Sequence, residues 1–329
     1  MSSGPPASRS DATSTPLRIV FMGTPPLAAH ILNRLLDSQG ALLRVVAVVT
    51  QPDQPRDRGL RMEPSAVAAA AASRGLMILK PEKIRTPEFL AALKALAPDL
   101  LVVAAYGRIL PDPVLAVARL MPINVHASLL PRHRGASPVE GAILAGDRET
   151  GVTIMRITSR MDAGPILLAR AIPIASDETQ GSLKTKLAEL GAAALLDAIA
   201  QIARGEIVET AQDEALATYT RPIEKRDSMI DWKADASHIE RMVRAYDPWP
   251  IARTTMRGEL LMIHRAALAQ DGAGAAEPGT IVDLGRAPIV QCGRGRLVLV
   301  EVQAAGRKRM PAADFMRGRR IAIGERLGI

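Results

Sequence analysis

Asn124 and His126 stand two positions apart in the apolar stretch Ile123-Asn-Val-His126, which reads as the end of a β-strand. Successive side chains of a strand point to opposite faces, so residues two apart share one face. An asparagine amide can donate a hydrogen bond, while a histidine exchanges a proton near pH 7. The pair could therefore carry acid–base chemistry. Taken alone, it is better explained as polar side chains that cap the following loop, so its assignment depends on the residues that come next.

A spaced series of glycines and polar residues follows this pair. It consists of His126-Ala-Ser-Leu-Leu-Pro-Arg-His-Arg-Gly135, Gly141, Gly146, Gly151-Val-Thr153 and Asp162-Ala-Gly-Pro-Ile166. The series resembles the catalytic segment of the 10-formyltetrahydrofolate-dependent formyltransferases, with every element present and in order. The resemblance implies that Asn124, His126 and the downstream Asp162 surround the formyl carbon of the donor.

The donor side of the site has its own matching residues. Tyr106-Gly107 follows an apolar run at 100–104 and is similar to the Tyr-Gly pair on the folate side of the family. Without the surrounding match, an ordinary strand end would explain these two residues. The resemblance implies that the folate donor contacts Tyr106 and Gly107, together with Ser128, Leu129, Leu130 and Pro131.

Formyl transfer is an acyl transfer, and each step needs a particular group. A neutral amine attacks the formyl carbon, an oxyanion develops in a tetrahedral intermediate, and N10 of the folate leaves after gaining a proton. Asn124 can donate its amide N–H to the oxyanion, and His126 can donate a proton or hydrogen bond to the same centre. Asp162 should favour a protonated His126 by its charge and can accept the proton of the amine. No metal is required, and five histidines with one cysteine offer no convincing metal-ligand cluster.

A further motif bears on the acceptor. Thr50-Gln-Pro-Asp-Gln-Pro-Arg-Asp-Arg58-Gly59 resembles the loop that methionyl-tRNA formyltransferases insert after the second strand to grip the acceptor end of the tRNA. Three C-terminal motifs agree with that group, namely Asp247-Pro-Trp-Pro250, Pro278-Gly-Thr280 and Ala305-Gly-Arg-Lys308. The resemblance implies that initiator methionyl-tRNA is the partner and that its first base pair, weak or absent, is recognised. The expected tRNA-binding residues are Arg58, Arg61, Arg132, Arg134, Arg307 and Lys308.

Some positions depart from the family pattern. Leu60 stands where the loop usually has the first of two basic residues, and Glu63 adds an acid, so the affinity of the loop for tRNA is in question. Pro26 and Leu27 replace a common Asp and Phe, and His133 replaces a common aromatic residue. None of these changes affects Asn124, His126 or Asp162.

Several related functions have to be weighed. Glycinamide ribonucleotide formyltransferase resembles residues 17–204 but has no counterpart to the C-terminal third, whereas sugar-nucleotide formyltransferases and the hydrolase part of formyltetrahydrofolate dehydrogenase carry a comparable extra domain. A sugar-nucleotide formyltransferase would have no use for loop 51–63. A non-catalytic RNA-binding protein built on this fold should have lost the catalytic trio, which this chain retains.

The first part of the chain has the pattern of repeated βα units around a doubly wound, mostly parallel, Rossmann-like sheet. Ligands bind beyond the carboxyl ends of strands in such sheets, which is where Asn124 and His126 stand. Gly23-Thr-Pro25 follows the first strand but lacks the later glycines of a dinucleotide fingerprint, and it favours a tight turn in which proline opens a helix. Strands are predicted at 17–22, 43–49, 76–79, 100–104, 123–126 and 151–158, and helices at 26–38, 65–74, 87–97, 138–145 and 179–203.

The pattern changes beyond residue 204. Residues 205–224 have weak periodicity and are expected to form a linker that crosses the surface. A helix is predicted at 236–245, and short alternating runs at 252–256, 259–265, 279–284, 288–292 and 296–302 predict a small C-terminal β-barrel of OB type. Residues 1–224 carry 24 Lys+Arg against 22 Asp+Glu, and residues 225–329 carry 18 against 12, so the latter hold +6 of the net +8. This balance suits a polyanionic partner, although a merely soluble face would also explain it.

The composition fits a globular protein of two domains, since 329 residues are roughly twice the common size of one. Only 2% of the residues are aromatic, so Leu, Ile, Val and Ala must fill the core. Residues 1–16 are expected to be a disordered tail without signal-peptide character, and no apolar run of about 18 residues predicts a membrane span. The single Cys292 excludes an intramolecular disulfide. We expect a cytoplasmic monomer with a catalytic domain at 17–204, a linker at 205–224 and a tRNA-binding barrel domain at 225–329.

Overall fold

The computed structural model describes residues 15–56, 61–270 and 276–328. The chain divides into two compact units, each assembled from several segments. Unit 1 comprises residues 1–126, 153–168 and 191–211, and unit 2 comprises residues 127–152, 169–190 and 212–329. Of the expected N-terminal tail, residues 1–14 lie outside the described residues.

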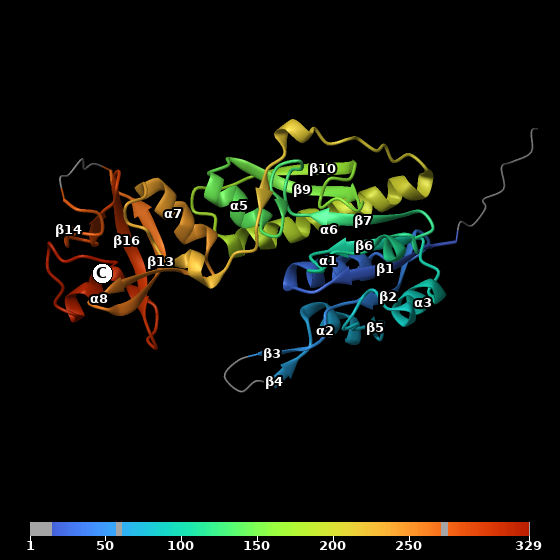
Figure 1. Cartoon of the computed structure of the whole chain (residues 1–329), viewed down its shortest axis with the longest axis horizontal. Coiled ribbons are helices and arrows are strands. Elements are labelled where there is room, and N and C mark those ends of the chain that lie inside the picture. Colours follow the sequence, from blue (N-terminus) through green and yellow to red (C-terminus); the bar gives the residue numbers. More distant parts are fainter. Residues whose placement is uncertain (1–14, 57–60, 271–275, 329) are drawn as a thin grey trace, which may run out of the picture. The chain divides into compact units, whose positions relative to one another are not determined.

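A seven-stranded sheet forms the framework of the N-terminal part (Figure 1). From β7 across β6, β1 and β2 to β5 all neighbours run parallel, and β9 runs antiparallel to β7. The strand order is β10-β9-β7-β6-β1-β2-β5, with bounds β1 (Leu17–Gly23), β2 (Leu43–Val49), β5 (Met77–Leu79), β6 (Leu100–Ala104), β7 (Met121–His126), β9 (Glu149–Arg156) and β10 (Ile166–Pro173). The prediction of a mostly parallel sheet is confirmed, whereas β10 was not predicted.

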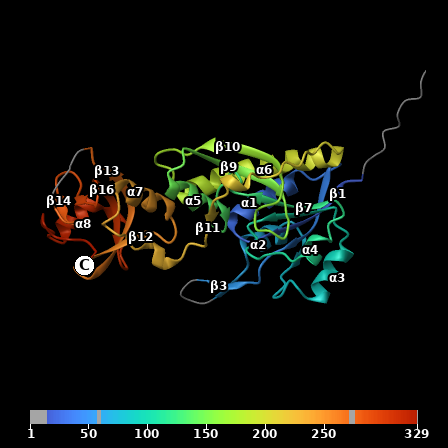
Figure 2. The same ribbon diagram turned by 45° about the horizontal axis from the view of Figure 1, so that its top comes forward.

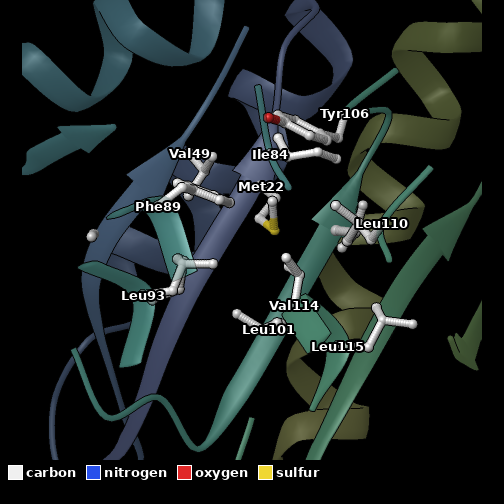
Figure 3. Packing of buried hydrophobic residues seen from close by; sticks show 13 residues of the cluster. Met22, Val49, Ile84, Phe89, Leu93, Leu101, Tyr106, Leu110, Val114 and Leu115 are labelled. Carbon is white, nitrogen blue, oxygen red and sulfur yellow. The ribbon is translucent and has the colours of Figure 1, made fainter. Parts of the chain in front are cut away.

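Apolar residues on both faces of the sheet explain why helices cover both sides. Val20 and Met22 of β1 pack in a buried cluster with Phe89 and Leu93 of α3 (Pro87–Ala95). Figure 3 shows Met22, Phe89 and Leu93 of this cluster. Because side chains alternate along a strand, the fully buried Phe21 points to the opposite face. That face is in contact with α1 (Pro26–Asp37). The other helices here are α2 (Ala66–Ala72) and α4 (Asp112–Leu115).

Local signals in the sequence set the ends of these helices. The hydroxyl of Thr86 accepts a hydrogen bond from the backbone N–H of Phe89 at 3.2 Å, and Pro87 occupies the first turn of α3. Gly23 permits the predicted tight turn into α1, because a Cβ there would lie 2.7 Å from the Cβ of Ala28. These features confirm the predicted helix starts.

The inserted loop after β2 forms a short hairpin of β3 (Gln54–Arg56) and β4 (Arg61–Glu63). Its two ends are joined by a 2.6 Å hydrogen bond between the hydroxyls of Thr50 and Ser65. Lys80 pairs with Asp53 at 2.6 Å near its base. Arg58 and Leu60 lie outside the described residues, and the side chain of Arg61 does as well.

Unit 2 contains α5 (Pro138–Ala145), the first part of α6 (Gln180–Arg204) and α7 (Ala236–Ala245), and α5 packs against α7. Residues 205–224, which are expected to form a linker that crosses the surface, contain short regular elements. These elements include a 3-10 turn at Glu214–Leu216 and the strand β11 (Tyr219–Thr220), which pairs in parallel with β8 (Arg134–Gly135). A second 3-10 turn follows at Lys225–Ser228.

The C-terminal part of unit 2 holds an antiparallel sheet, in which β12, β13, β14 and β16 are labelled in Figure 2. The strand order is β12-β13-β16-β15-β14, and β17 pairs with β16. The bounds are β12 (Ala252–Met256), β13 (Glu259–Leu268), β14 (Ile281–Asp283), β15 (Ile289–Gln291), β16 (Arg296–Ala304), β17 (Met310–Pro311) and α8 (Ala312–Gly318). Alternate residues of β12 and β16 are buried, as the period-2 pattern predicted. All five predicted C-terminal strand runs are present.

Aliphatic side chains dominate the buried residues, as the low aromatic content required. Along the described parts of the chain, no helix combines the length and the apolar character that crossing a membrane requires.

Candidate active site

Asn124 and His126 lie on β7, which runs between β6 and β9. They are two residues apart on a regular strand, so their side chains share one face of the sheet, as the sequence predicted. Asn124 is partly buried, and the side chain of His126 is only 6% exposed. The strand thus presents an amide and an imidazole side by side in a largely dry environment.

Asp162 approaches His126 from the turn between β9 and β10. Its Oδ2 lies 3.7 Å from Nδ1 of His126, and its side chain is 17% exposed. The turn that carries it folds back on β9, with the N–H of Arg156 donating to the carbonyl of Pro165 at 3.0 Å. Gly164 makes this return possible, because a Cβ there would lie 1.9 Å from the carbonyl oxygen of Arg156. Two titratable side chains at ion-pair distance, next to an amide donor, are the groups that acyl transfer to an amine requires.

The Tyr106-Gly107 pair joins three strand ends. The carbonyl of Tyr106 accepts hydrogen bonds from the Thr24 hydroxyl at 3.0 Å and from Nε2 of Gln51 at 2.9 Å. Thr24 follows β1 and Gln51 follows β2, so these bonds tie the carboxyl ends of β1 and β2 to the segment after β6. Gly107 has a φ of +83°, and a Cβ there would lie 2.5 Å from Nε2 of Gln51. Glycine is therefore required at this position.

The ring of Tyr106 belongs to the core rather than to an open pocket. It is 1% exposed and lies in the cluster with Ile84 and Leu110 (Figure 3). Burial raises the pKa of the Tyr106 hydroxyl above its usual range, so the group stays neutral at physiological pH. The expectation that this pair contacts folate remains a prediction. Because the ring of Tyr106 is buried, the contact would involve the backbone of Tyr106 and Gly107.

The sequence predicts no individual role for Thr24 or Gln51, which occur within the turn Gly23-Thr-Pro25 and the loop motif Thr50–Gly59. Thr24 follows Gly23, the last residue of β1, and Gln51 stands two residues after the end of β2. This position at strand ends is a sequence signal that could have singled them out. Their function depends on reaching the carbonyl of Tyr106, which lies 82 and 55 residues away in the chain.

The loop after β7 is internally bonded. The hydroxyl of Ser128 donates to the carbonyl of Arg132 at 2.6 Å, and the N–H of Arg132 donates to the carbonyl of Leu129 at 3.1 Å. Ser128 is fully buried and Leu130 is 7% exposed. This bonding gives the segment from Ser128 to Pro131 a fixed shape, and its contact with the donor stays a prediction.

Three of the arginines and lysines expected to bind tRNA are exposed. Arg132 pairs with Asp147 at 2.5 Å and is 53% exposed. Arg307 and Lys308 lie in the exposed turn 305–309 between β16 and β17, where Nε2 of Gln303 donates to the carbonyl of Arg307 at 2.7 Å. Cations held on an exposed, braced turn are suited to phosphate groups.

Arg134 differs from these residues. Its side chain is 0% exposed, and the guanidinium is bonded to Gln212, Glu214 and Tyr219. The sequence-based interpretation of Arg134 as a tRNA contact is therefore not supported by its position. The preceding residue, His133, also has a side-chain partner, because its Nε2 lies 2.7 Å from Oδ2 of Asp147.

Comparison with known proteins bears on the whole chain. The model of the family described as "Formyl transferase" matches residues 17–199, and that of "Formyl transferase, C-terminal domain" matches residues 222–320. Methionyl-tRNA formyltransferase of Roseiflexus sp. (strain RS-1) is 48% identical over 313 residues, covering 95% of this chain and 96% of that protein. Methionyl-tRNA formyltransferase of Methylococcus capsulatus is 47% identical over 312 residues, covering 95% of this chain and 100% of that protein.

Solved structures share the fold at lower identity. HypX from Aquifex aeolicus in complex with tetrahydrofolic acid is similar at a TM-score of 0.60 and 18% identity over 94% of this chain, which spans 48% of the length of HypX. An N-formyltransferase from Helicobacter canadensis, in complex with folinic acid and dTDP-3-aminofucose, reaches a TM-score of 0.63 at 16% identity, covering 88% of this chain and 99% of that one. Both family models match, and the relatives at 47% and 48% identity cover 95% of the chain, so the chain belongs to the formyl transferase family.

Proposed function

We propose that this protein transfers the formyl group of 10-formyltetrahydrofolate to the free amino group of methionyl-initiator-tRNA, giving N-formylmethionyl-tRNA for translation initiation in the cytoplasm. The observation that carries the reaction is the 3.7 Å approach of Asp162 to His126, with Asn124 on the same strand. The acceptor is inferred from relatives that are 47% and 48% identical and named methionyl-tRNA formyltransferase.

In the proposed mechanism each of the three side chains acts at one stage. As the C–N bond to the amine forms, negative charge collects on the formyl oxygen, and the amide of Asn124 donates a hydrogen bond to it. His126 donates a hydrogen bond to the same oxygen, and Asp162 accepts the proton that the amine loses. N10 gains a proton from the His126–Asp162 pair as its bond to the carbon breaks, which returns the proton that the amine lost. No side chain becomes acylated, so catalysis consists of positioning, proton transfer and charge stabilisation.

The proposed division of labour places chemistry in residues 17–204 and tRNA binding in residues 225–329, with 205–224 between them. The separate family matches at 17–199 and 222–320 support these boundaries. We also propose that the C-terminal sheet is a barrel of OB type. Leu327 bridges to Met256 of β12 and Arg326 bridges to Thr280, just before β14, so the chain end contacts both edge strands of the sheet.

The decisive experiment supplies the purified protein with 10-formyltetrahydrofolate and charged initiator tRNA and measures formyl-methionine after deacylation. Formyl-methionine formed in proportion to enzyme supports the proposal. An amino sugar nucleotide is offered in parallel, because one protein of similar fold was solved with dTDP-3-aminofucose. Formylation of the sugar without formyl-methionine would replace the proposed acceptor by an amino sugar.

Replacement of Arg58 by alanine should lower catalytic efficiency on charged initiator tRNA by about tenfold or more, or about 1.4 kcal/mol. The planar guanidinium would otherwise hold a phosphate or base edge at the acceptor end. Steady-state kinetics at matched salt measure the effect, and binding of 10-formyltetrahydrofolate should be unchanged. Arg44→Ala, at an exposed position of β2, is the matched control. Equal efficiency of Arg58→Ala and the wild type would remove the loop from tRNA recognition.

A double replacement of Arg307 and Lys308 by alanine should weaken tRNA binding and flatten its dependence on salt. Each lost phosphate contact lowers the slope of log K against log salt by roughly 0.7 to 0.9. Filter-binding titrations from low to moderate salt give this slope. Arg294→Gln serves as control, because Arg294 is exposed but already paired with Asp235 at 2.6 Å. An unchanged slope in the double variant would place the phosphate contacts elsewhere.

A further inference from the structure

Arg134 is a fully buried arginine in the loop that follows the catalytic strand. Its Nε and one terminal nitrogen donate to Oε1 of Gln212 at 3.1 and 2.8 Å, and its terminal nitrogens donate to the two carboxylate oxygens of Glu214 at 3.1 and 3.0 Å. The Tyr219 hydroxyl accepts a further bond at 3.1 Å, and the guanidinium lies 5.8 Å from the ring centroid of Tyr219. Arginine is rarely buried this completely unless its charge is paired. The arrangement is therefore a specific one.

The backbone joins the same two segments. The N–H of Arg134 donates to the carbonyl of Thr218 at 2.9 Å, and the N–H of Thr218 donates to the carbonyl of Pro131 at 3.3 Å. Oγ1 of Thr218 and Oγ1 of Thr220 accept from the N–H groups of His133 and Ser137, at 2.8 and 3.1 Å. Segment 212–220 thus provides bonding partners along loop 127–137.

The two segments can approach closely because residue 135 is glycine. This residue has a φ of +107°, and a Cβ there would lie 2.2 Å from the carbonyl oxygen of Thr220. Any other residue would push the strands β8 and β11 apart. Each of these strands has only two residues, and so short a pair is not stable without further contacts. The side chain of Arg134 supplies those contacts, because its rigid fork fits one arrangement of Gln212 and Glu214.

We propose that Arg134 is a positioning residue for formyl transfer, which clamps segment 212–220 to loop 127–137 and so fixes the loop. The inference rests on the proposed function, because Ser128 to Pro131 of this loop are the expected donor contacts and the loop begins directly after His126. Segment 212–220 then stabilises the conformation of loop 127–137, in addition to connecting the two domains. A loosened loop misplaces the donor, and a displacement of about 1 Å can cost on the order of 100-fold in rate.

The test compares Arg134→Lys, Glu214→Gln and the double variant. Single-turnover formyl transfer should fall by about 10- to 100-fold in Arg134→Lys, because lysine keeps the charge but cannot make the forked bonds. Glu214→Gln should reduce the same rate, although Glu214 lies in the linker. The double variant should be no slower than the slower single variant, since residues that share one interaction are not additive.

A tRNA-binding role would give a different result, which makes the two roles separable. If Arg134 is a positioning residue, the variants keep their affinity for initiator tRNA and its salt slope within about twofold of the wild type. Their transfer rate falls, and their binding of 10-formyltetrahydrofolate weakens. If Arg134 contacts phosphate, Arg134→Gln lowers the salt slope by roughly one contact, and Glu214→Gln leaves the transfer rate unchanged. That pattern would overturn the proposal.

Matched variants guard the interpretation. Arg226→Gln removes an exposed arginine just beyond the linker that pairs with Glu224 at 2.9 Å, and it should transfer formyl at the wild-type rate. Thermal unfolding shows which variants remain folded, and if Arg134→Lys does not fold, Glu214→Gln and Tyr219→Phe carry the test alone. Wild-type rates in these folded linker variants would refute the clamp. If the wild type formylates an amino sugar instead of the tRNA, the proposed function fails, while slowed sugar transfer in the clamp variants would still support the clamp.

Discussion

Replacement of His126 by alanine is expected to slow formyl transfer by at least about 100-fold, the usual scale for losing an acid–base group. Asp162→Asn should produce a loss of similar size, because it keeps the shape of the side chain but removes its ability to accept a proton. The two side chains lie 3.7 Å apart and are 6% and 17% exposed, so bulk water replaces neither well. Single-turnover rates with saturating donor and charged tRNA measure the effect.

The control for this prediction is His238→Ala, which removes an exposed histidine of α7 and should leave the rate unchanged. Affinity for tRNA should stay near the wild-type value in the His126 and Asp162 variants, because the loss concerns the chemical step. The double variant should lose little more than either single variant if the two groups act as one unit. Near wild-type turnover in both single variants would refute the assignment of the site.

Replacement of Asn124 by alanine should raise the barrier by roughly 2.7–4 kcal/mol, the effect of losing one donor to an oxyanion. Its amide would contribute only when charge develops on the formyl oxygen, so kcat should fall while the KM for the tRNA changes little. Asn124→Asp should lower kcat at least as much, because it replaces the amide donor by a carboxylate of similar shape. The carboxylate is negatively charged and cannot donate a hydrogen bond.

Asn33→Ala, a replacement of the partly buried asparagine of α1, is the matched control for this second prediction. Thermal unfolding of both variants separates a loss of stability from a loss of activity. A fall in kcat of less than about threefold in folded Asn124→Ala would mean that another group stabilises the oxyanion.

The sequence by itself determined most of the local structure. Strands at Leu43–Val49 and Leu100–Ala104 and the helix at Pro138–Ala145 agree with the predicted bounds, because apolar periodicity is a property of neighbouring residues. Cap residues such as Thr86 act within one helical turn, and they fixed the start of α3. The shared face of Asn124 and His126 follows from the two-residue period of a strand alone.

The tertiary structure decided which distant groups meet. Asp162 reaches His126 only because β9 runs back along β7 and Gly164 allows the next turn to close on it. The ring of Tyr106 lies in the core, which only the packing of the surrounding elements decides, while its contact with folate stays a prediction. The carbonyl of Tyr106 is held by Thr24 and Gln51, which no local pattern connects to it.

Arg134 shows the same limit most clearly. An arginine in a polar loop next to Arg132 has the sequence context of a surface cation, and its own neighbours in the chain do not distinguish the two residues. Arg132 is half exposed beside Asp147, whereas Arg134 is buried by partners 78 to 85 residues away. Whether a charged side chain faces solvent or is enclosed depends on which segments are packed over it. Short-range patterns carry no information on that packing, because it results from contacts between parts of the chain that are remote in sequence.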